Sequence, residues 1–176
     1  MNIYLILYNI RSLYNVGSAF RTADAFGVSK IYLCGYTGAP TDRLGRPVRE
    51  VAKTALGAER TVPWEKAWQT WRLIERLKNE GVFVVALENN VSEAVPINKI
   101  KFSFLRGRAG RDAALVLGNE VTGLSKSILK RADAIAEIPM HGKKESLNVA
   151  IACGIGLYAL TNPSRSPWGG LSAKEG

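Results

Sequence analysis

Three separated segments of this chain carry polar side chains of the kinds that bind ligands and stabilise charge. These side chains belong to Asn15 and Arg21, to Asn119 and Glu120, and to Ser146 and Asn148. Each of them alone also has a purely structural interpretation. Asn15 could cap a helix, Glu120 could be a solvated turn residue, and Ser146 could be a helix cap whose hydroxyl accepts a hydrogen bond from the Asn148 or Val149 backbone. The choice between these interpretations depends on whether the fold brings the segments together.

Two predicted strands end where two of these segments begin. Residues 113–117 form an apolar run that stops at Gly118, and residues 135–138 run into Pro-Met-His-Gly. In open α/β sheets, a buried strand that ends in this way presents backbone and polar groups to a ligand. Ser146 and Asn148 then open a helix, residues 146–160, which is apolar nearly all the way round. Two strand ends that converge on one helix start predict a binding site.

Alternating strand and helix patterns predict the elements that position this site. Strands are expected at residues 3–8, 30–33, 82–87, 113–117 and 135–138, and helices at 16–26, 48–56, 64–79 and 146–160. This alternation is typical of an α/β fold with a mostly parallel sheet and helices on both faces. We expect one domain over residues 1–160 and a loose tail over 161–176. Asn15 is the expected N-cap of the first helix, and Arg21 points away from its apolar face.

Composition limits the functional classes. Apolar residues make up 47% and charged residues 22%, as in globular proteins. The net charge of +9 and a pI near 9.8 favour a polyanionic partner such as nucleic acid, although a solvated basic surface is the alternative. Cys34 and Cys153 stand alone, which predicts reduced thiols, a cytoplasmic protein and no metal site. A signal peptide and a membrane-spanning run are not expected.

Two common nucleotide-binding signatures are not supported. Gly154, Gly156 and Ala159 fit the spacing G-x-G-x-x-A, but they lie inside a predicted helix and not at a strand-to-helix turn. A glycine followed at P-loop spacing by Gly-Lys-Ser or Gly-Lys-Thr does not occur in the sequence. Dinucleotide binding and ATP hydrolysis therefore have no sequence support.

In their order and spacing, the three segments closely resemble the SpoU-type (TrmH-like) RNA ribose 2′-O-methyltransferases of the SPOUT superfamily. The segments are Asn15-Val-Gly-Ser-Ala-Phe-Arg21, Leu117-Gly-Asn-Glu-Val-Thr-Gly-Leu-Ser125, and Ile138-Pro-Met-His-Gly followed by Ser146-Leu-Asn-Val. The resemblance implies a C-terminal deep trefoil knot that forms the S-adenosyl-L-methionine pocket, and a homodimer with each active site at the subunit interface. The apolar helix 146–160 favours a partner independently, because a helix without a polar face needs cover on all sides.

The resemblance also implies roles for individual residues. The catalytic set corresponds to Arg21, Asn15, Glu120, Ser146 and Asn148. The cofactor contacts correspond to Leu87, Gly118, Ile138, Met140, Ser146 and Leu147. Two positions depart from the usual pattern of the family. Ala150 replaces a small hydroxyl residue, and Glu88-Asn89 occupies a strand end where relatives often have Thr or Ser, so local cofactor contacts are expected to differ.

Methyl transfer to a ribose hydroxyl needs positioning and proton removal, because the sulfonium donor is already electrophilic. The family assigns activation of the hydroxyl to the arginine that matches Arg21. A guanidinium stays protonated, so we expect Arg21 to hold a phosphate beside the ribose and to stabilise negative charge on the oxygen. Whether it acts on the hydroxyl directly or through the phosphate stays open. His141, the sole histidine, is a weaker candidate base that the family motif does not require.

RNA contacts are expected at basic residues of the long loop and its helix, namely Arg43, Arg46, Arg49 and Lys53. The basic segment 99–111 is either a second contact or a solvated loop. The predicted substrate is tRNA or ribosomal RNA. Two alternatives to a ribose methyltransferase remain: a non-catalytic RNA-binding protein of the same fold, and a knotted methyltransferase that modifies base nitrogens.

Overall fold

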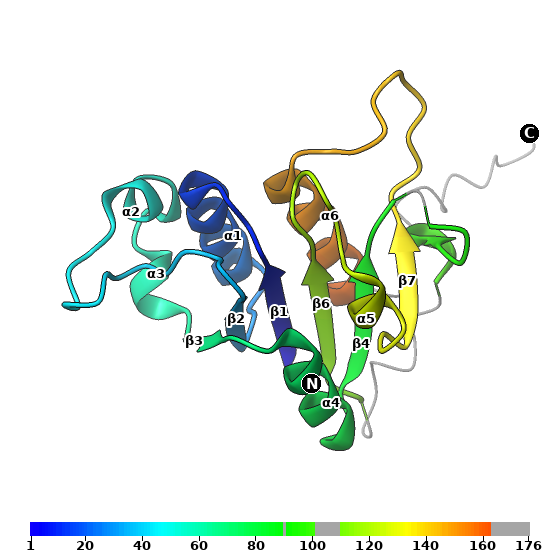
Figure 1. The fold of residues 1–176 in the computed structure, drawn as a ribbon, viewed down its shortest axis with the longest axis horizontal. Helices are drawn as coiled ribbons and strands as arrows, with labels where there is room; N and C mark the ends of the chain where they lie inside the picture. Colours follow the sequence, from blue (N-terminus) through cyan, green and yellow to red (C-terminus); the bar gives the residue numbers. More distant parts are fainter. Residues whose placement is uncertain (90, 101–109, 163–176) are drawn as a thin grey trace, which may run out of the picture.

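Seven strands form one parallel sheet in a computed structural model that describes residues 1–89, 91–100 and 110–162 (Figure 1). The strands are β1 Ile3–Tyr8, β2 Lys30–Cys34, β3 Trp64–Ala67, β4 Phe83–Leu87, β5 Val95–Pro96, β6 Ala113–Leu117 and β7 Ala134–Glu137. Their order is β3-β2-β1-β6-β4-β7-β5, and every pair in this sheet is parallel. The predicted α/β fold with a mostly parallel sheet is confirmed.

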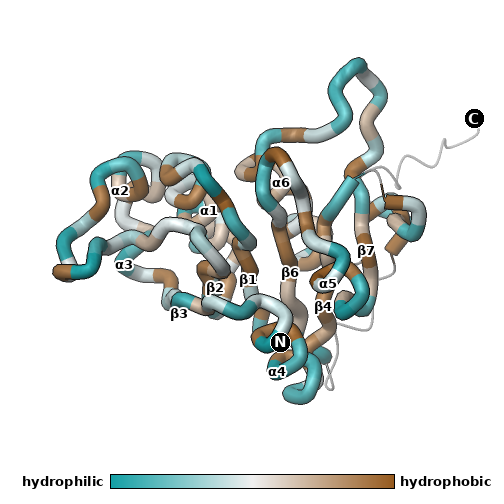
Figure 2. The backbone as a smooth tube through the Cα atoms, in the orientation of Figure 1, coloured by the Kyte–Doolittle hydropathy of each residue, from teal (hydrophilic) through white to brown (hydrophobic). Residues whose placement is uncertain are grey.

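Helices cover both faces of the sheet, as predicted. They are α1 Leu13–Ala25, α2 Arg49–Ala55, α3 Ala58–Thr61, α4 Thr70–Asn79, α5 Lys126–Leu129 and α6 Val149–Thr161, with a 3-10 turn at Ile97–Lys99. One apolar cluster joins α1, α2, α3 and α6 to the sheet, and a second joins α4 and α5 to the opposite face. Along the chain, hydrophobic residues concentrate in the strands and α6, whereas the connecting loops are largely hydrophilic (Figure 2).

The central strands are buried on both faces. All five residues of β6 are buried, and its neighbours β1 and β4 each pair with it in register, so that Leu7 and Leu87 both lie opposite Leu117. Successive side chains alternate between the two apolar clusters, with Leu115 in one and Val116 in the other. Such strands read as continuous apolar runs, which is why β1 and β6 were predictable to the residue.

One predicted helix is wrong over its first part. Residues 64–79 were expected to be a single helix, but residues 64–67 form strand β3 and only Thr70–Asn79 is helical. Trp64 pairs with Ile31 and Ala67 with Cys34, so β3 completes the sheet beside β2. The apolar residues of this segment have helical spacing, but pairing with β2 stabilises residues 64–67 as a strand. Local sequence does not reveal such a pairing.

Two helix starts also differ from the prediction. The N-cap of α1 is Ser12, whose hydroxyl accepts from the Asn15 backbone N–H at 3.3 Å, so Asn15 lies in the first turn and is not the cap. Helix α6 begins at Val149, and its cap is Asn148, which accepts from the Ala150 N–H at 2.8 Å. The interpretation of Ser146 as a helix cap is therefore wrong.

Several other expectations have a definite outcome. Helix α3, strand β5 and the 3-10 turn were not predicted. The basic segment at 101–109 and the tail at 163–176 lie outside the described residues. Both cysteines are buried and free, and burial raises the pKa of Cys34 to about 11 and that of Cys153 to about 12. Within the described ranges, no helix is long and apolar enough to cross a membrane.

Candidate functional site

A cavity of about 290 Å³ opens at the carboxyl ends of β4, β6 and β7. Its walls come from the three loops that follow these strands and from the first turn of α6. The lining residues are Leu87, Glu88, Asn89, Leu117, Gly118, Asn119, Glu120, Val121, Thr122, Gly123, Ile138, Glu145, Ser146, Leu147, Val149 and Ala152. The two predicted strand ends and the start of the apolar helix therefore do share one cavity.

A tight loop after β6 forms one wall. Asn119 and Gly123 form an antiparallel bridge, so the chain folds back on itself directly after Gly118. A Cβ atom at Gly118 would lie 2.7 Å from the Gly123 carbonyl carbon and 2.8 Å from the Leu124 nitrogen. Both of these are backbone atoms that cannot turn aside. The strand therefore has to end in glycine for this wall to form.

Asn119 holds this loop and ties it to the N-terminal half of the sheet. Its Oδ1 accepts from the backbone N–H groups of Val121 at 2.8 Å and Thr122 at 2.9 Å. Its Nδ2 donates to the Asn9 carbonyl at 2.8 Å and to the Tyr36 hydroxyl at 2.6 Å. Only 6% of the surface of Asn119 is exposed. Its side chain therefore has a structural role both within its own loop and toward the N-terminal half of the sheet.

The structure brings three of the predicted catalytic residues into one hydrogen-bonded set. Asn15 Nδ2 donates to Glu120 Oε1 at 3.1 Å, and Asn148 Nδ2 donates to Asn15 Oδ1 at 3.3 Å. The second oxygen of Glu120 accepts from the Arg11 backbone N–H at 3.3 Å. Residues more than 100 positions apart thus meet beside the cavity, and Ser146 lines the same space.

Two adjacent residues at the end of β4 connect the walls of the cavity. Glu88 Oε2 accepts from the Leu124 N–H at 2.6 Å and so holds the loop after β6. Asn89 holds the loop after β7: its Nδ2 donates to the carbonyls of Ile138 at 3.0 Å and Glu145 at 3.2 Å, and its Oδ1 accepts from the Ile138 N–H at 3.1 Å. Burial raises the pKa of the Glu88 carboxyl, and hydrogen bonds from the Leu124 and Asn89 backbone partly oppose this.

Sequence reasoning noted Glu88 and Asn89 only as a departure from the family pattern. The signal that could have found their role was present, because they follow a buried strand directly, as Asn119 and Glu120 do. Polar residues at the carboxyl ends of neighbouring parallel strands lie at the same edge of the sheet. Which loop each side chain holds, however, depends on tertiary contacts.

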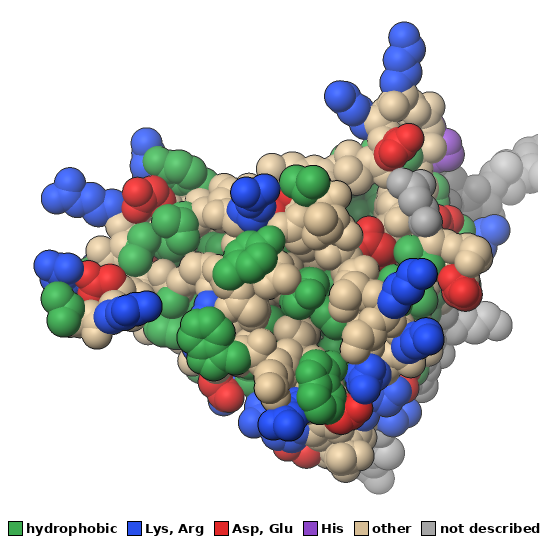
Figure 3. All heavy atoms as spheres, in the orientation of Figure 1, with side chains coloured by type: hydrophobic (Ala, Val, Ile, Leu, Met, Phe, Trp, Pro, Cys, Tyr) green, Lys and Arg blue, Asp and Glu red, His purple; other side chains and the backbone are tan. Residues whose placement is uncertain are grey.

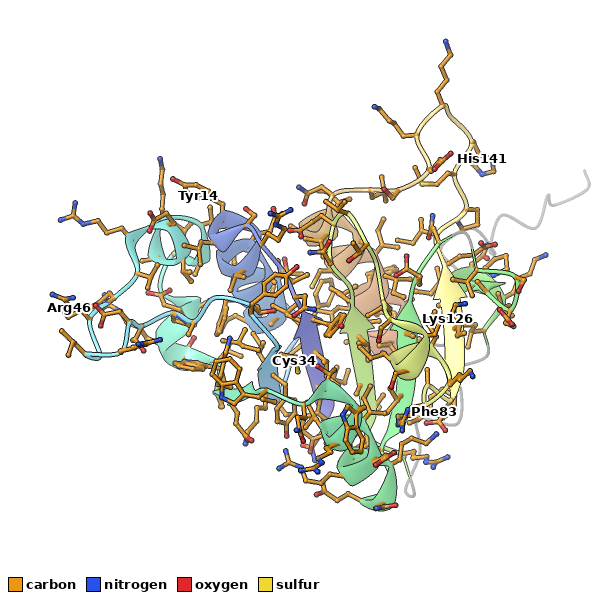
Figure 4. All side chains as sticks on the ribbon, in the orientation of Figure 1. Tyr14, Cys34, Arg46, Phe83, Lys126 and His141 are labelled. Atoms are coloured by element: carbon orange, nitrogen blue, oxygen red, sulfur yellow. The ribbon has the colours of Figure 1, made fainter. Side chains whose placement is uncertain are left out.

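The other predicted residues lie as follows. Five of the six predicted cofactor contacts line the cavity, namely Leu87, Gly118, Ile138, Ser146 and Leu147, whereas Met140 does not. Arg21 is exposed on α1, nearly two helical turns beyond Asn15, and makes no ion pair with any described acidic residue. His141 is exposed on the projecting loop between β7 and α6 (Figure 4).

The four basic residues predicted to bind RNA are all exposed, and Arg46 lies at the far end of the molecule from His141 (Figure 4). Arg46 pairs with Asp42 at 2.8 Å, and Lys53 lies over the Tyr14 ring with 5.9 Å between its Nζ and the ring centroid. Arg43 and Arg49 make no ion pair with a described residue. Within the described ranges, no group of three or more His, Cys, Asp or Glu could hold a metal ion.

Comparison with known proteins gives the family. The family model described as SpoU rRNA Methylase family matches residues 2–158. The chain belongs to this family. A SpoU relative from Coxiella burnetii, named 23S rRNA (guanosine-2'-O-)-methyltransferase RlmB, is 35% identical over 163 residues, or 93% of this chain and 59% of that protein. The RlmB of Bordetella pertussis is 32% identical over 88% of this chain and 57% of its own length. The chain thus spans less than two thirds of these SpoU relatives.

Solved structures of similar fold agree with this family assignment. An AdoMet-bound rRNA methyltransferase from Sinorhizobium meliloti superposes with a TM-score of 0.78 at 31% identity, covering 92% of this chain and 56% of that one. A second structure, described as giving insights into the 2-OH methylation of C/U34 on tRNA, has a TM-score of 0.74 at 25% identity. It covers 92% of this chain and 95% of its own, so this SpoU chain matches it nearly end to end.

Proposed function

We propose that this protein is an S-adenosyl-L-methionine-dependent RNA methyltransferase that modifies a ribose 2′-hydroxyl. The observation that carries the proposal is the cavity beside the Glu120–Asn15–Asn148 set, where the three segments of the family motif meet. Membership of the SpoU family supports the reaction, and an AdoMet-bound neighbour of the same fold supports the cofactor.

The charge of the cavity fits this cofactor. Its lining includes three carboxylates, those of Glu88, Glu120 and Glu145, and no Lys, Arg or His among the described residues. The protein as a whole carries a net charge of +9, so this acidic lining is a local exception. S-adenosyl-L-methionine has a sulfonium and an ammonium against one carboxylate, hence a net positive charge. Such a lining favours a cationic ligand and disfavours nucleotide phosphates.

The apolar part of the lining fits the nucleoside end of the same cofactor. Leu87, Ile138 and Leu147 provide aliphatic walls, and Gly118 lets the backbone approach closely. Ser146 adds a hydroxyl at the rim. These residues would hold the cofactor, which supplies an electrophilic methyl group when bound.

The residues around the cavity have the chemistry to present a ribose. Arg21 does not line the cavity of its own chain, but a guanidinium brought to the rim would hold an RNA phosphate and stabilise negative charge on the 2′-oxygen, while the hydroxyl proton leaves to phosphate or water. Asn15 is hydrogen-bonded to both Glu120 and Asn148, so it orients these two side chains beside the cavity. S-adenosyl-L-methionine would supply the methyl group there, and the residues of this chain would bind and orient the ribose.

A homodimer and a C-terminal trefoil knot are part of the proposal. Helix α6 leaves Ile151 56% exposed, together with Ile155 and Tyr158, at positions that share one helical face. An apolar face of this kind supports a second subunit packed against it. In such a dimer, Arg21 on α1 of one protomer serves the cavity at the interface.

The proposed substrate is a structured RNA in the cytoplasm. The relatives named above act on 23S rRNA by name, whereas the neighbour that matches nearly end to end concerns C/U34 of tRNA. The proposed substrate class is therefore tRNA or rRNA. Exposed Arg43, Arg49 and Lys53 supply phosphate contacts.

Two measurements test the proposal. Calorimetry with S-adenosyl-L-methionine tests the cavity, and nucleoside analysis of tRNA and rRNA treated with labelled donor identifies the methylated atom. We expect cofactor binding and a labelled 2′-O-methylnucleoside. RNA binding without cofactor binding would point to a non-catalytic protein of this fold, and label on a base nitrogen would point to a base methyltransferase. Either result refutes the proposal.

A further inference from the structure

The aromatic rings of three exposed side chains, Tyr36, Trp68 and Trp71, have no role in the site described above, although the Tyr36 hydroxyl accepts a hydrogen bond from Asn119. Trp68 is 76% exposed, Tyr36 58% and Trp71 37%. Burying large aromatic side chains is strongly favourable. Exposure of several of them in one region therefore indicates a binding surface. We call these three residues the aromatic strip.

The strip begins at the cavity and leads away from it. The Tyr36 hydroxyl accepts from Asn119 Nδ2 in the loop that walls the cavity, at 2.6 Å. Strands β2 and β3 are paired up to Cys34 and Ala67, and the Gly35 N–H donates to the Ala67 carbonyl at 3.1 Å. Tyr36 and Trp68 therefore follow the ends of two neighbouring strands. Trp71 continues the strip in the first turn of α4.

Cations accompany each tryptophan. Lys66 Nζ lies 5.3 Å from the centroid of the Trp68 ring, and the guanidinium carbons of Arg72 and Arg131 lie 5.0 and 5.4 Å from that of Trp71. Lys66 and Arg72 make no ion pair with a described acidic residue, although the Lys66 ammonium also donates to the Thr37 carbonyl. On this face, hydrophobic side chains are interspersed with Lys and Arg (Figure 3).

We propose that the aromatic strip binds unpaired RNA nucleotides next to the target, by stacking their bases on Trp68 and Tyr36 while Lys66 and Arg72 lie near their phosphates. Exposed aromatic faces with adjacent cations are the chemistry that binds single-stranded nucleic acid. In the order β3-β2-β1-β6, three strand spacings separate Trp68 from Gly118, or about 15 Å. A few nucleotides of single strand cover that span.

The strip specifies the class of substrate, and this inference rests on the proposed methyltransferase function. Bases inside a duplex present their faces to each other and not to a protein. The enzyme is therefore selective for a target in a loop or another unpaired segment. A continuous helix would offer phosphates to the basic residues but no base to the strip.

The test compares Trp68→Ala, Trp68→Leu and Trp68→Phe in the full chain. The probes are a labelled oligouridylate and a duplex of equal length. Loss of one stacking contact is expected to weaken single-strand binding roughly 5- to 150-fold in the Ala and Leu variants. The Phe variant keeps an aromatic face and most of the affinity, and duplex binding stays unchanged. Leu is the matched control, because it keeps apolar area but not the ring.

Cofactor calorimetry on the same variants separates this inference from the proposed function. All three variants are expected to bind S-adenosyl-L-methionine like the parent protein. If the parent binds no cofactor but still loses single-strand affinity on Trp68→Ala, the methyltransferase proposal fails and the stacking contact stands. Full single-strand affinity in the Leu variant, an equal loss on the duplex, or a changed oligomeric state in the Ala variant would each overturn the stacking proposal.

Discussion

Replacing Asn89 by alanine should open the cofactor cavity without unfolding the sheet. The Asn89 side chain makes three hydrogen bonds to the loop after β7, two at Ile138 and one at the Glu145 carbonyl. These bonds fix the position from which Ser146 and Leu147 approach the cavity. Without them, the contacts left between the end of β4 and this side of the cavity, among the described residues, are the short pairing of β4 with β7 and the hydrogen bond from the Glu88 N–H to the Ala136 carbonyl.

The size of the effect follows from these three bonds. A hydrogen bond of this kind contributes about 0.5–1.5 kcal/mol net, and the groups here are partly open to water, so about 1–3 kcal/mol is lost. If that energy holds the loop in its binding position, the open form becomes dominant and the apparent affinity for S-adenosyl-L-methionine falls roughly 5- to 150-fold. Asn89→Asp keeps the acceptor but turns a charge toward two carbonyls, and it should bind no better than the alanine variant.

Calorimetry with S-adenosyl-L-methionine measures this loss, and urea unfolding monitors the fold. Asn79→Ala is the matched control, since Asn79 is an exposed residue at the end of α4, away from the cavity. Cofactor affinity in Asn89→Ala equal to that of the control would refute the assignment of Asn89 as the residue that holds this wall. A large loss of global stability with unchanged affinity would refute it as well.

Four further outcomes are expected. Gly118→Ala forces a Cβ atom against the backbone of the loop after β6, so it should cost about 1–3 kcal/mol in urea unfolding and abolish cofactor binding, whereas Gly142→Ala, with open space around it, should do neither. Burial raises the pKa of Glu88, so the stabilising contribution of this carboxyl is present at acid pH and is lost as pH rises through its folded-state pKa. Glu88→Gln should therefore unfold at a higher urea concentration than the parent at neutral pH. This difference between the two proteins should shrink toward pH 4.5. Arg21→Ala should abolish methylation in the labelled-donor assay while cofactor calorimetry stays nearly unchanged, and lost cofactor binding would contradict its role. Ile151→Lys should yield monomers by light scattering if the exposed face of α6 is the subunit interface.

The sequence predicted those parts of the fold that depend on local burial. Strand β6 is buried along its whole length and β1 is buried except at Tyr4 and Tyr8, which are partly buried, so an apolar run marked each of them to the residue. Strand β3 was missed, because a four-residue edge strand gets its identity from pairing with β2 and not from its own pattern. The cap of α1 was misplaced for a different reason: Ser12 and Asn15 both suit an N-cap, and the chain geometry selects between them.

The candidate site divides in the same way. Motif order placed Asn15, Glu120 and Asn148 in one set, and their side chains do meet. Asn119 was grouped with Glu120 among the polar side chains that could bind a ligand, yet it is a buried connector between the loop after β6 and the turn at Asn9. Nothing in a sequence distinguishes an amide that faces a ligand from one that satisfies backbone groups. That distinction depends on which loops lie within reach.

In the proposed methyltransferase, the distribution of charge constrains how RNA and S-adenosyl-L-methionine can be arranged. A cavity lined by Glu88, Glu120 and Glu145 repels RNA phosphates, and this repulsion is strongest where burial excludes water. The polyanion therefore has to remain at the rim and offer only a ribose, while cations outside the cavity bind its phosphates. Arg21 is exposed and unpaired among the described residues, as such a cation must be. It follows that reversing the charge inside the cavity should cost cofactor affinity, whereas removing charge at the rim should cost only RNA affinity and its dependence on salt.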